Sequence, residues 1–344
     1  MATIAHIGID LAKNVIQVHG IDANGKVLLK KMVKRSELIK TIMNIEPCVI
    51  GMEACGGAHY WARRFSEFGH EVKLMAAQFV APYRKNQKND ANDAEAICEA
   101  LTRPSMRFVP KKSVDQQAVL SLHRTRALLV GQRTAIVNHM RGLLLEFGIA
   151  ISRGIQKARN QLPGILEDGD NELPDIVREL IAHNVQHLKL LDARIGDLDK
   201  QLDHLAKQSE LSQRILKIEG IGPLCATAMI ASIGDAKLFN NGRQLAAWLG
   251  LTPKQYSSGG KTRLGRITKG GNRYLRTLLI QGAKSALFQC ARKKDQKSHW
   301  AMQIRERRNH NIAVVALAAK NARTIWALLA KNREYQHDYQ PMAA

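Results

Sequence analysis

Residues 4–10 read I-A-H-I-G-I-D, a short apolar run that ends in an aspartate. Residues 47–53 read P-C-V-I-G-M-E, a second apolar run, which ends in a glutamate. Both runs are typical of buried β-strands. If the two strands are parallel neighbours, the carboxylates of Asp10 and Glu53 emerge at the same edge of one sheet. These two runs therefore define the core of the predicted fold.

The segments around these two strands have the lengths and spacings of further strands and helices. Strands are predicted at 14–20, 26–33 and 70–75, and helices at 36–45, 58–68 and 92–101. The turn D-A-N-G at 22–25 separates the second and third strands. Three adjacent strands followed by alternating helices and strands predict a mixed α/β domain over residues 1–110.

From Val114 onward the pattern changes to long helices, with one predicted over residues 115–147. Residues 160–174 contain two prolines and two glycines and are predicted to be a loop. An apolar seam with alternating steps of four and three follows: Val177, Ile181, Asn184, Leu188, Leu191, Ile195, Leu198, Leu202 and Leu205. This coiled-coil period has two interpretations, a helical hairpin packed on itself or an arm that joins another subunit. Residues 111–210 are thus predicted to be a helical coiled-coil segment.

The last third of the chain, residues 211–344, is predicted to be mainly α-helical. The segment I-E-G-I-G-P at 218–223 resembles the turn of a helix-hairpin-helix unit, in which glycines let the backbone approach a phosphate. An ordinary glycine-rich helix connection is the alternative. Further helices are predicted at 243–249, 272–290 and 310–331.

The net charge of +22 is concentrated in this C-terminal third. Residues 211–344 hold 23 Lys and Arg against 6 Asp and Glu. A domain with this excess of positive charge attracts polyanions, chiefly nucleic acid. The chain has no run of eighteen apolar residues and no basic, apolar leader, so neither a membrane span nor a signal peptide is expected. Its five scattered cysteines suit a reducing cytosol.

Four carboxylates are candidates for a metal site. Asp90 and Asp93 lie three residues apart at a predicted helix start, and they would join Asp10 and Glu53 at the sheet edge. Four carboxylates from three elements suit two divalent cations, for which Mg²⁺ is the preferred ion and Mn²⁺ a substitute. The alternative is that these residues are turn residues or helix caps. A G-I-D strand also opens actin-like ATPases, but L-A-K-N-V follows here in place of their phosphate hairpin.

The basic segment Y-S-S-G-G-K-T-R at 256–263 places Ser257 and Ser258 before two glycines. A serine nucleophile needs an exposed hydroxyl, room for a phosphate and nearby positive charge. The residues alone favour a phosphate-contacting loop over a nucleophile, because no general base adjoins the serines. The predicted nucleic-acid contacts of the C-terminal third are Gly220, Gly222, Lys254, Lys261, Arg263, Arg266, Lys269 and Arg273.

Taken together, five segments resemble the DEDD-type transposases, or recombinases, of a bacterial insertion-sequence family. They are I-G-I-D-L-A-K at 7–13, M-E-A-C-G at 52–56, N-D-A-N-D-A at 89–94, I-E-G-I-G at 218–222 and L-A-A-W-L-G-L-T-P-K-Q-Y-S-S-G at 245–259. They occur in the family's order and with similar spacing. The resemblance covers nearly the whole chain.

The resemblance implies an RNase H-like N-terminal domain whose four acids, here Asp10, Glu53, Asp90 and Asp93, bind Mg²⁺. It also implies a serine in a Tyr-x-Ser-Gly context that attacks DNA and becomes transiently linked to a phosphate. Y-S-S-G assigns that role to Ser258 and leaves Ser257 at the variable position. Gly260 stands where relatives carry serine, which is a departure in the local loop.

The implied partners are DNA, at the element ends and the target, and a structured guide RNA from the element. The coiled coil would join the domains at 1–110 and 211–344 and support a dimer or tetramer, so the acids and the serine could come from different subunits. The implied location is the bacterial cytoplasm, on the nucleoid when active. Two alternatives stay open: a junction-resolving endonuclease that uses only the four acids, and a non-catalytic nucleic-acid-binding protein.

Overall fold

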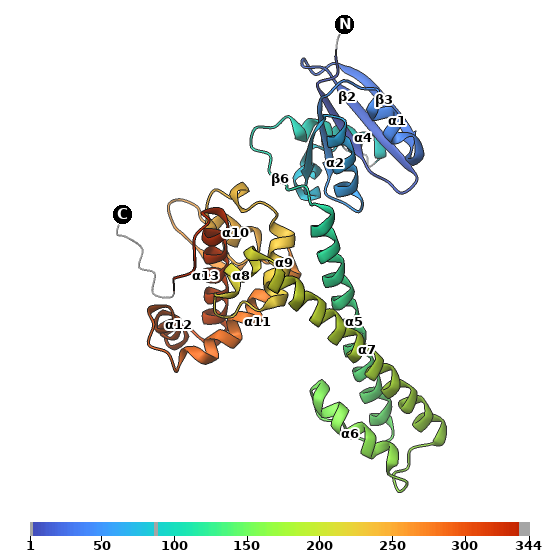
Figure 1. The fold of residues 1–344 in the computed structure, drawn as a ribbon, viewed down its shortest axis with the longest axis vertical. Coiled ribbons are helices and arrows are strands. Elements are labelled where there is room, and N and C mark those ends of the chain that lie inside the picture. The colour runs from blue at the N-terminus through green and yellow to red at the C-terminus, as the bar shows by residue number, and fades with distance from the viewer. Residues whose placement is uncertain (1–2, 86–88, 337–344) are drawn as a thin grey trace. The chain divides into compact units, whose positions relative to one another are not determined.

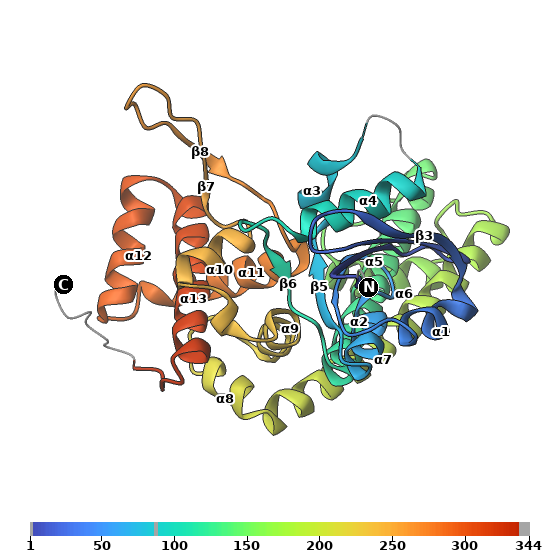
Figure 2. The same cartoon turned by 90° about the horizontal axis from the view of Figure 1, so that it is seen from above.

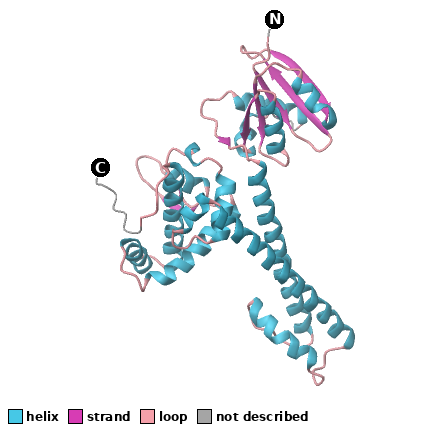
Figure 3. Ribbon diagram, viewed as in Figure 1, coloured by secondary structure: helices cyan, strands magenta, loops and turns pink. Residues whose placement is uncertain are grey.

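The computed structural model describes residues 3–85 and 89–336. The chain forms two compact units, one of residues 1–116 with 233–238 and the other of residues 117–232 with 239–344 (Figure 1). Strands are concentrated in the first unit, whereas the second is almost wholly helical (Figure 3). The prediction of a mixed α/β N-terminal part and a mainly helical C-terminal part is confirmed.

The first unit is built on a six-stranded sheet in the order β3-β2-β1-β4-β5-β6. Its strands are β1 (His6–Asp10), β2 (Val15–Ile21), β3 (Val27–Lys34), β4 (Val49–Glu53), β5 (Glu71–Met75) and β6 (Phe108–Val109). Its helices are α1 (Leu38–Met43), α2 (Ala58–Glu67), α3 (Ala77–Val80) and α4 (Asp90–Leu101). β1 pairs antiparallel with β2 and parallel with β4, and β4 pairs parallel with β5. β1 and β4 are therefore parallel neighbours.

Strand alternation sends the residues of β1 and β4 to two different faces of the sheet. Ile7 and Ile9 of β1 lie in the core that contains Trp61 and Phe65 of α2. Gly8 faces the other way, toward α4: a Cβ on Gly8 would lie 2.2 Å from the carbonyl oxygen of Ala94. Figure 2 shows α4 on one side of the sheet and α1 and α2 on the other. The absence of a side chain at Gly8 thus lets the backbone of α4 approach the strand.

β4 repeats this arrangement with a looser fit. Ile50 and Met52 lie in the α2-side core. A Cβ on Gly51 would lie 3.2 Å from Leu101 Cδ2 and 3.3 Å from Ile97 Cγ2, both side-chain atoms of α4. The two central strands therefore carry their glycines on one face, and α4 covers that face.

The second unit begins with long helices. They are α5 (Val114–Glu146), α6 (Ile155–Glu167) and α7 (Asp175–Gln208). Residues of the predicted apolar seam, Ile181 and Leu188, pack with Val137 and Met140 of α5 in one core. Between α5 and α7, Arg126 pairs with Asp199, and Arg133 pairs with Asp192 at 3.2 Å. Asn184 donates to the carbonyl of Leu180 in its own helix at 2.9 Å. These seam residues of α7 thus pack against α5 in a helical hairpin within one chain.

The prediction of a loop over residues 160–174 is wrong for its first half. α6 continues through Pro163 to Glu167. Ala158 and Leu162 are buried against α5 and α7, with Ile165 and Leu166 packed beside them. The apolar face that these residues form offsets the local cost of a proline inside the helix.

The remaining elements follow α7 in the chain. They are α8 (Glu210–Leu216), α9 (Pro223–Ile233), α10 (Gly242–Trp248), β7 (Pro253–Gln255), β8 (Leu264–Ile267), α11 (Arg273–Cys290), α12 (Gln296–Arg307) and α13 (His310–Ala330). β7 and β8 form an antiparallel hairpin. α13 is long and apolar enough to cross a membrane by length and composition. It packs against α8, α10, α11 and α12 and buries eight residues there, as the core helix of a globular bundle does.

Substituting Gly8 with alanine tests the close approach of α4 to β1. We expect Gly8→Ala to lower the free energy of unfolding by roughly 3 kcal/mol, because the new methyl group meets backbone atoms of Ala94 and Cys98 that cannot move aside. Gly51→Ala is the control, with an expected loss of about 1 kcal/mol, because its neighbours are flexible side chains. Equal losses in chemical denaturation would contradict this account.

Candidate functional site

The ends of β1 and β4 carry the first two candidate acids. Asp10 is the last residue of β1, two positions after Gly8, and Glu53 is the last residue of β4, two positions after Gly51. Because side chains alternate along a strand, both acids lie on the face that α4 covers. The parallel pairing of β1 and β4 brings both strand ends to one edge of the sheet.

The first turn of α4 carries the other two candidate acids. Asn89 caps this helix, and its side-chain oxygen accepts a hydrogen bond of 2.8 Å from the backbone N–H of Asn92. The helix therefore begins two residues earlier than the predicted start at Asn92. Asp90 and Asp93 both fall within its first turn. The contact between α4 and β1 at Gly8 places this turn over the end of β1.

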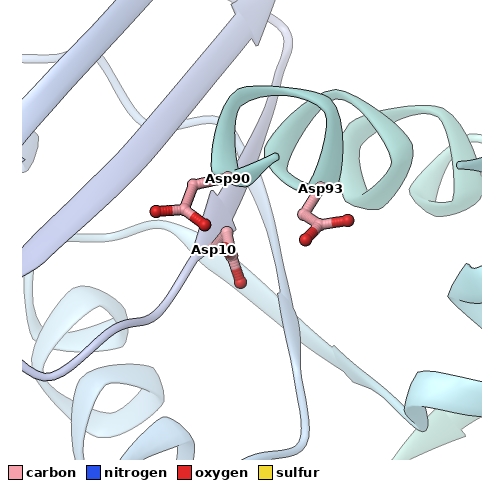
Figure 4. A group of neighbouring side chains, drawn as sticks. All are labelled: Asp10, Asp90 and Asp93. Carbon is pink, nitrogen blue, oxygen red and sulfur yellow. The ribbon is translucent and has the colours of Figure 1, made fainter. Parts of the chain in front are cut away.

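Three of the four acids come together at this point. One carboxylate oxygen each from Asp10, Asp90 and Asp93 lie within 4.8 Å of one another. Figure 4 shows Asp10 at the end of its strand beside the turn of α4 that carries Asp90 and Asp93. Glu53 is outside this close group, at the end of the neighbouring strand. The arrangement offers the oxygen ligands that Mg²⁺ and Mn²⁺ accept.

The electrostatics of the group fit a cation. Burial and the negative charges of Asp93, Asp90 and Glu53 raise the pKa of Asp10 from 3.8 to about 6. The positive charge of Arg84 opposes this rise, and Arg84 Nε lies 2.5 Å from Asp93 Oδ1. A divalent cation would neutralise the negative charge of these carboxylates, which Arg84 alone does not balance.

A cavity of about 530 Å³ adjoins the strand ends that carry Asp10 and Glu53. It is lined by Leu11, Ala12, Lys13, Arg35, Cys55, Gly56 and Gly57. Arg35 is held there by a hydrogen bond of 3.3 Å to the carbonyl of Ala12 and by stacking over the Trp61 ring at 5.1 Å. Lys13 and Arg35 therefore give positive charge to a cavity whose lining residues follow Asp10 and Glu53 in the chain.

The predicted serine lies at the tip of the β7–β8 hairpin. Ser258, Gly259, Gly260 and Lys261 form its turn, closed by a hydrogen bond of 3.1 Å from the backbone N–H of Lys261 to the carbonyl of Ser258. Gly259 and Gly260 have φ values of +54° and +74°, as a two-residue hairpin turn requires. Gly260 therefore fits the turn, although relatives were expected to carry serine there. Ser258 is exposed, and the Ser257 hydroxyl accepts a hydrogen bond of 2.9 Å from Gln255.

Six predicted nucleic-acid contacts surround this turn or its base. Lys254, Lys261, Arg263, Arg266, Lys269 and Arg273 are all exposed. The hairpin extends from the helical bundle that carries it (Figure 2). Residues 253–273 contain no Asp, Glu or His, so the whole extension is positively charged. Such a surface follows a phosphate backbone.

The base of the hairpin is fixed to α11 by Arg276, which the sequence analysis did not single out. This buried arginine donates to the carbonyls of Leu249 and Gly270 at 3.0 and 2.7 Å. Those carbonyls flank the hairpin on both sides. Asn272 caps α11 by accepting from the backbone N–H groups of Tyr274 and Leu275. The base of the hairpin is thus tied to a helix.

A buried histidine, His123, connects α11 to two other helices, and sequence reasoning also missed it. Thr227 donates its hydroxyl hydrogen to the Pro223 carbonyl at 2.8 Å, so it accepts from His123 Nε2 at 3.0 Å. His123 Nδ1 then accepts from the Tyr274 hydroxyl at 3.0 Å. Burial lowers the pKa of His123 to about 4, consistent with a neutral ring. No spacing marks one histidine among twelve, so only the structure identifies this link.

The two glycines of the segment at 218–223 differ in their surroundings. Gly220 has a φ of +83°, and a Cβ there would lie 2.5 Å from the carbonyl oxygen of Gly282 in α11. Gly222 is exposed, with no atom within 4 Å of its Cβ position among the described residues. Gly220 is therefore needed for packing, and Gly222 is the one whose backbone is open to a phosphate.

Replacing single acids in the metal-free protein shows how repulsion among the carboxylates and the ion pair with Arg84 each affect the free energy of unfolding. Because the folded-state pKa of Asp10 lies above 3.8, stability falls as the pH rises from 3.8 to about 6. At neutral pH, Asp10→Asn should therefore raise the free energy of unfolding by on the order of 1 kcal/mol, after allowance for partial exposure. The gain should vanish below pH 3.8. Asp93→Asn should give less of this gain than Asp10→Asn, because it relieves repulsion on Asp10 but also removes the ion pair with Arg84.

Thermal melts with and without Mg²⁺ check this prediction. Added Mg²⁺ should raise the melting temperature of the unaltered chain and have little effect on either variant. Destabilisation of the metal-free protein by Asp10→Asn at neutral pH would show that the acids do not repel one another.

Two transposase family models match this chain. A DEDD transposase model named for IS110 matches residues 7–149, and the model of the transposase IS116/IS110/IS902 family matches residues 212–299. The chain is 49% identical over 334 residues to a probable family 20 transposase of Pseudomonas aeruginosa, covering 97% of this chain and 99% of the relative. It is 44% identical over 338 residues to the transposase for insertion sequence element IS1111A of Coxiella burnetii, covering 98% and 92%. This chain belongs to the IS110/IS116 family of DEDD transposases.

Proposed function

We propose that this transposase is a DNA recombinase that moves its own insertion sequence, with a Mg²⁺-dependent acidic site and Ser258 as nucleophile. The observation that carries the proposal is the convergence of Asp10, Asp90 and Asp93 at one end of the sheet. Glu53 is the fourth proposed ligand. The sheet order, with β1 antiparallel to β2 and parallel to β4, supports an RNase H-like domain at residues 1–110.

The acidic site would act on a phosphodiester of DNA. Asp10, Asp90, Asp93 and Glu53 would hold Mg²⁺, or Mn²⁺ in its place, and the bound cation would neutralise charge on the reacting phosphate. Lys13 and Arg35, beside the strand ends, would position the phosphate before reaction. Arg84 would keep Asp93 ionised and oriented through their ion pair.

Ser258 would carry the covalent step. Its Oγ forms a bond to phosphorus, one P–O ester bond of the strand breaks, and the deoxyribose oxygen leaves with the electron pair and takes up a proton from water. The serine proton passes to water or to a base outside the hairpin, because residues 253–273 hold no carboxylate or histidine. One ester bond replaces another, so rejoining needs no external energy source. Exposure of Ser258 on a turn and the positive charge around it support this role.

The remaining parts of the proposal concern partners. The basic domain at 211–344 would bind DNA and the element's structured guide RNA through phosphate contacts, including the open backbone at Gly222. The helical segment at 111–210 would support a dimer or tetramer. Exposed Leu180 and Leu190 on α7 are available for that contact, since the buried seam residues face α5.

Trapping a protein–DNA adduct on a donor plasmid tests the serine. We expect the unaltered chain with Mg²⁺ to give an adduct that survives denaturation and maps to Ser258. Ser258→Ala should abolish the adduct and reduce recombination by about 10³-fold or more. Ser257→Ala is the matched control, because Ser257 is the preceding residue and is also exposed, and it should retain the adduct.

Ser258→Ala and Asp10→Asn together separate the proposal, in which both changes stop recombination, from its two alternatives. A junction-resolving endonuclease would keep cutting DNA after Ser258→Ala and stop after Asp10→Asn. A non-catalytic binding protein would support transposition after both changes. An adduct that maps to another residue, or recombination by Ser258→Ala at the normal rate, would refute the serine mechanism.

A further inference from the structure

A second basic site lies in the C-terminal bundle. Its residues are not those of the basic hairpin. A pocket of about 720 Å³ opens between the start of α12, the last half of α13 and the segment that follows α13. Lys297, Lys320, Arg323, Leu328, Lys331 and Tyr335 are among its lining residues. None of them belongs to residues 253–273 or to the acidic site. A pocket of this size accommodates a small ligand or one unit of a polymer.

The pocket carries a strong excess of positive charge. Its lining holds five basic side chains: Lys297, Lys320, Arg323, Lys331 and Arg333. Glu334 is the one acid among the lining residues, and its carboxylate lies 2.6 Å from Lys217 Nζ, outside the pocket. The positive charge within the pocket is therefore not balanced by its own walls, and the ligand that suits it is an anion.

The ammonium group of Lys297 is a buried cation of this pocket. Its Nζ is buried and has no hydrogen-bond partner within residues 3–85 and 89–336. The carboxylates of Glu219 and Asp295 partly compensate its charge, and Glu219 already pairs with Lys293. Burial lowers the pKa of Lys297, and the charge of Lys320 adds to this effect. A buried ammonium without a hydrogen bond is costly, and a bound phosphate oxygen would lower that cost.

The other lining groups indicate what the anion is attached to. The Tyr335 ring lies 6.0 Å from Lys297 Nζ, and Ala327 and Leu328 supply an apolar part of the wall. A ligand with a flat ring and a phosphate group would contact the aromatic and apolar wall with its ring and the cations with its phosphate. Unpaired nucleotides offer both groups, whereas the bases of a duplex stay stacked within the helix.

We propose that this pocket binds one unpaired nucleotide of a nucleic-acid strand, with its phosphate on Lys297, Lys320 and Arg323 and its base against Tyr335. The pocket shares no residue with the acidic site or with the hairpin that carries Ser258. It would hold a single-stranded stretch of the DNA or RNA that the transposase handles. The proposal concerns binding alone, so it stands or falls independently of the serine mechanism.

Fluorescence anisotropy on the full chain tests the proposal with labelled 20-nucleotide single strands of DNA and RNA and with the matching duplex. We expect the double variant Lys297→Gln/Lys320→Gln to bind single strands about tenfold more weakly and to lower the salt dependence of binding by about one unit of slope. Lys284→Gln, an exposed change of the same kind on α11, is the matched control. Duplex binding should change no more than in the control.

Tyr335→Ala tests the base contact separately. It should weaken binding of a normal single strand by about tenfold and leave binding of an abasic strand unchanged, because only the former has a base to stack. Lys297→Gln should melt at the normal temperature or above it without nucleic acid, since it removes a buried, unpaired charge. This melt shows that weaker binding is not a result of misfolding.

Three results would overturn the proposal. One is single-strand binding by the double variant that equals that of Lys284→Gln. The second is an equal loss of duplex and single-strand binding, which would reduce the pocket to general surface charge. The third is tight binding of a free nucleoside monophosphate that leaves strand binding unaffected, which would assign the pocket to a small molecule.

Discussion

The candidate metal centre depends on the contact between β1 and α4 at Gly8. The strand has no side chain at this position, so the backbone of Ala94 and Cys98 lies directly against it. Strand alternation then places Asp10 on the same face, two residues further along. The first turn of α4 is capped by Asn89 and brings its acids to that point. A contact in the core thus sets the spacing of carboxylates at the sheet edge.

In the second unit, too, buried contacts hold the segment that carries a candidate functional residue. The basic hairpin offers its serine on an exposed turn, but Arg276 and the cap at Asn272 fix the base of that hairpin to α11. Tyr274 in turn ties α11 to His123 of α5. Repulsion among the basic side chains is tolerated here because it occurs on the exposed surface, where water screens it. Lys297 differs, because its charge is buried.

Much of the site could be predicted from sequence because its acids lie at the ends of strands or at the start of a helix that the sequence pattern marks. Asp10 and Glu53 close apolar runs, and Asp90 and Asp93 open a helix with an asparagine cap. The contact at Gly8 could not be predicted, since it depends on where α4 packs. The helix through Pro163 was missed because tertiary burial of Ala158 and Leu162 outweighs the local signal. Arg276, His123 and Lys297 were missed because their partners are distant in sequence and no motif marks them.

The central claim is that the packing of α4 on β1 creates a metal site from Asp10, Asp90 and Asp93. Anomalous X-ray scattering from crystals of the protein soaked in Mn²⁺ tests it most directly. The account predicts a strong peak within bonding distance of oxygens from all three aspartates. A peak elsewhere, or no peak at a Mn²⁺ concentration that supports DNA cleavage, would contradict it.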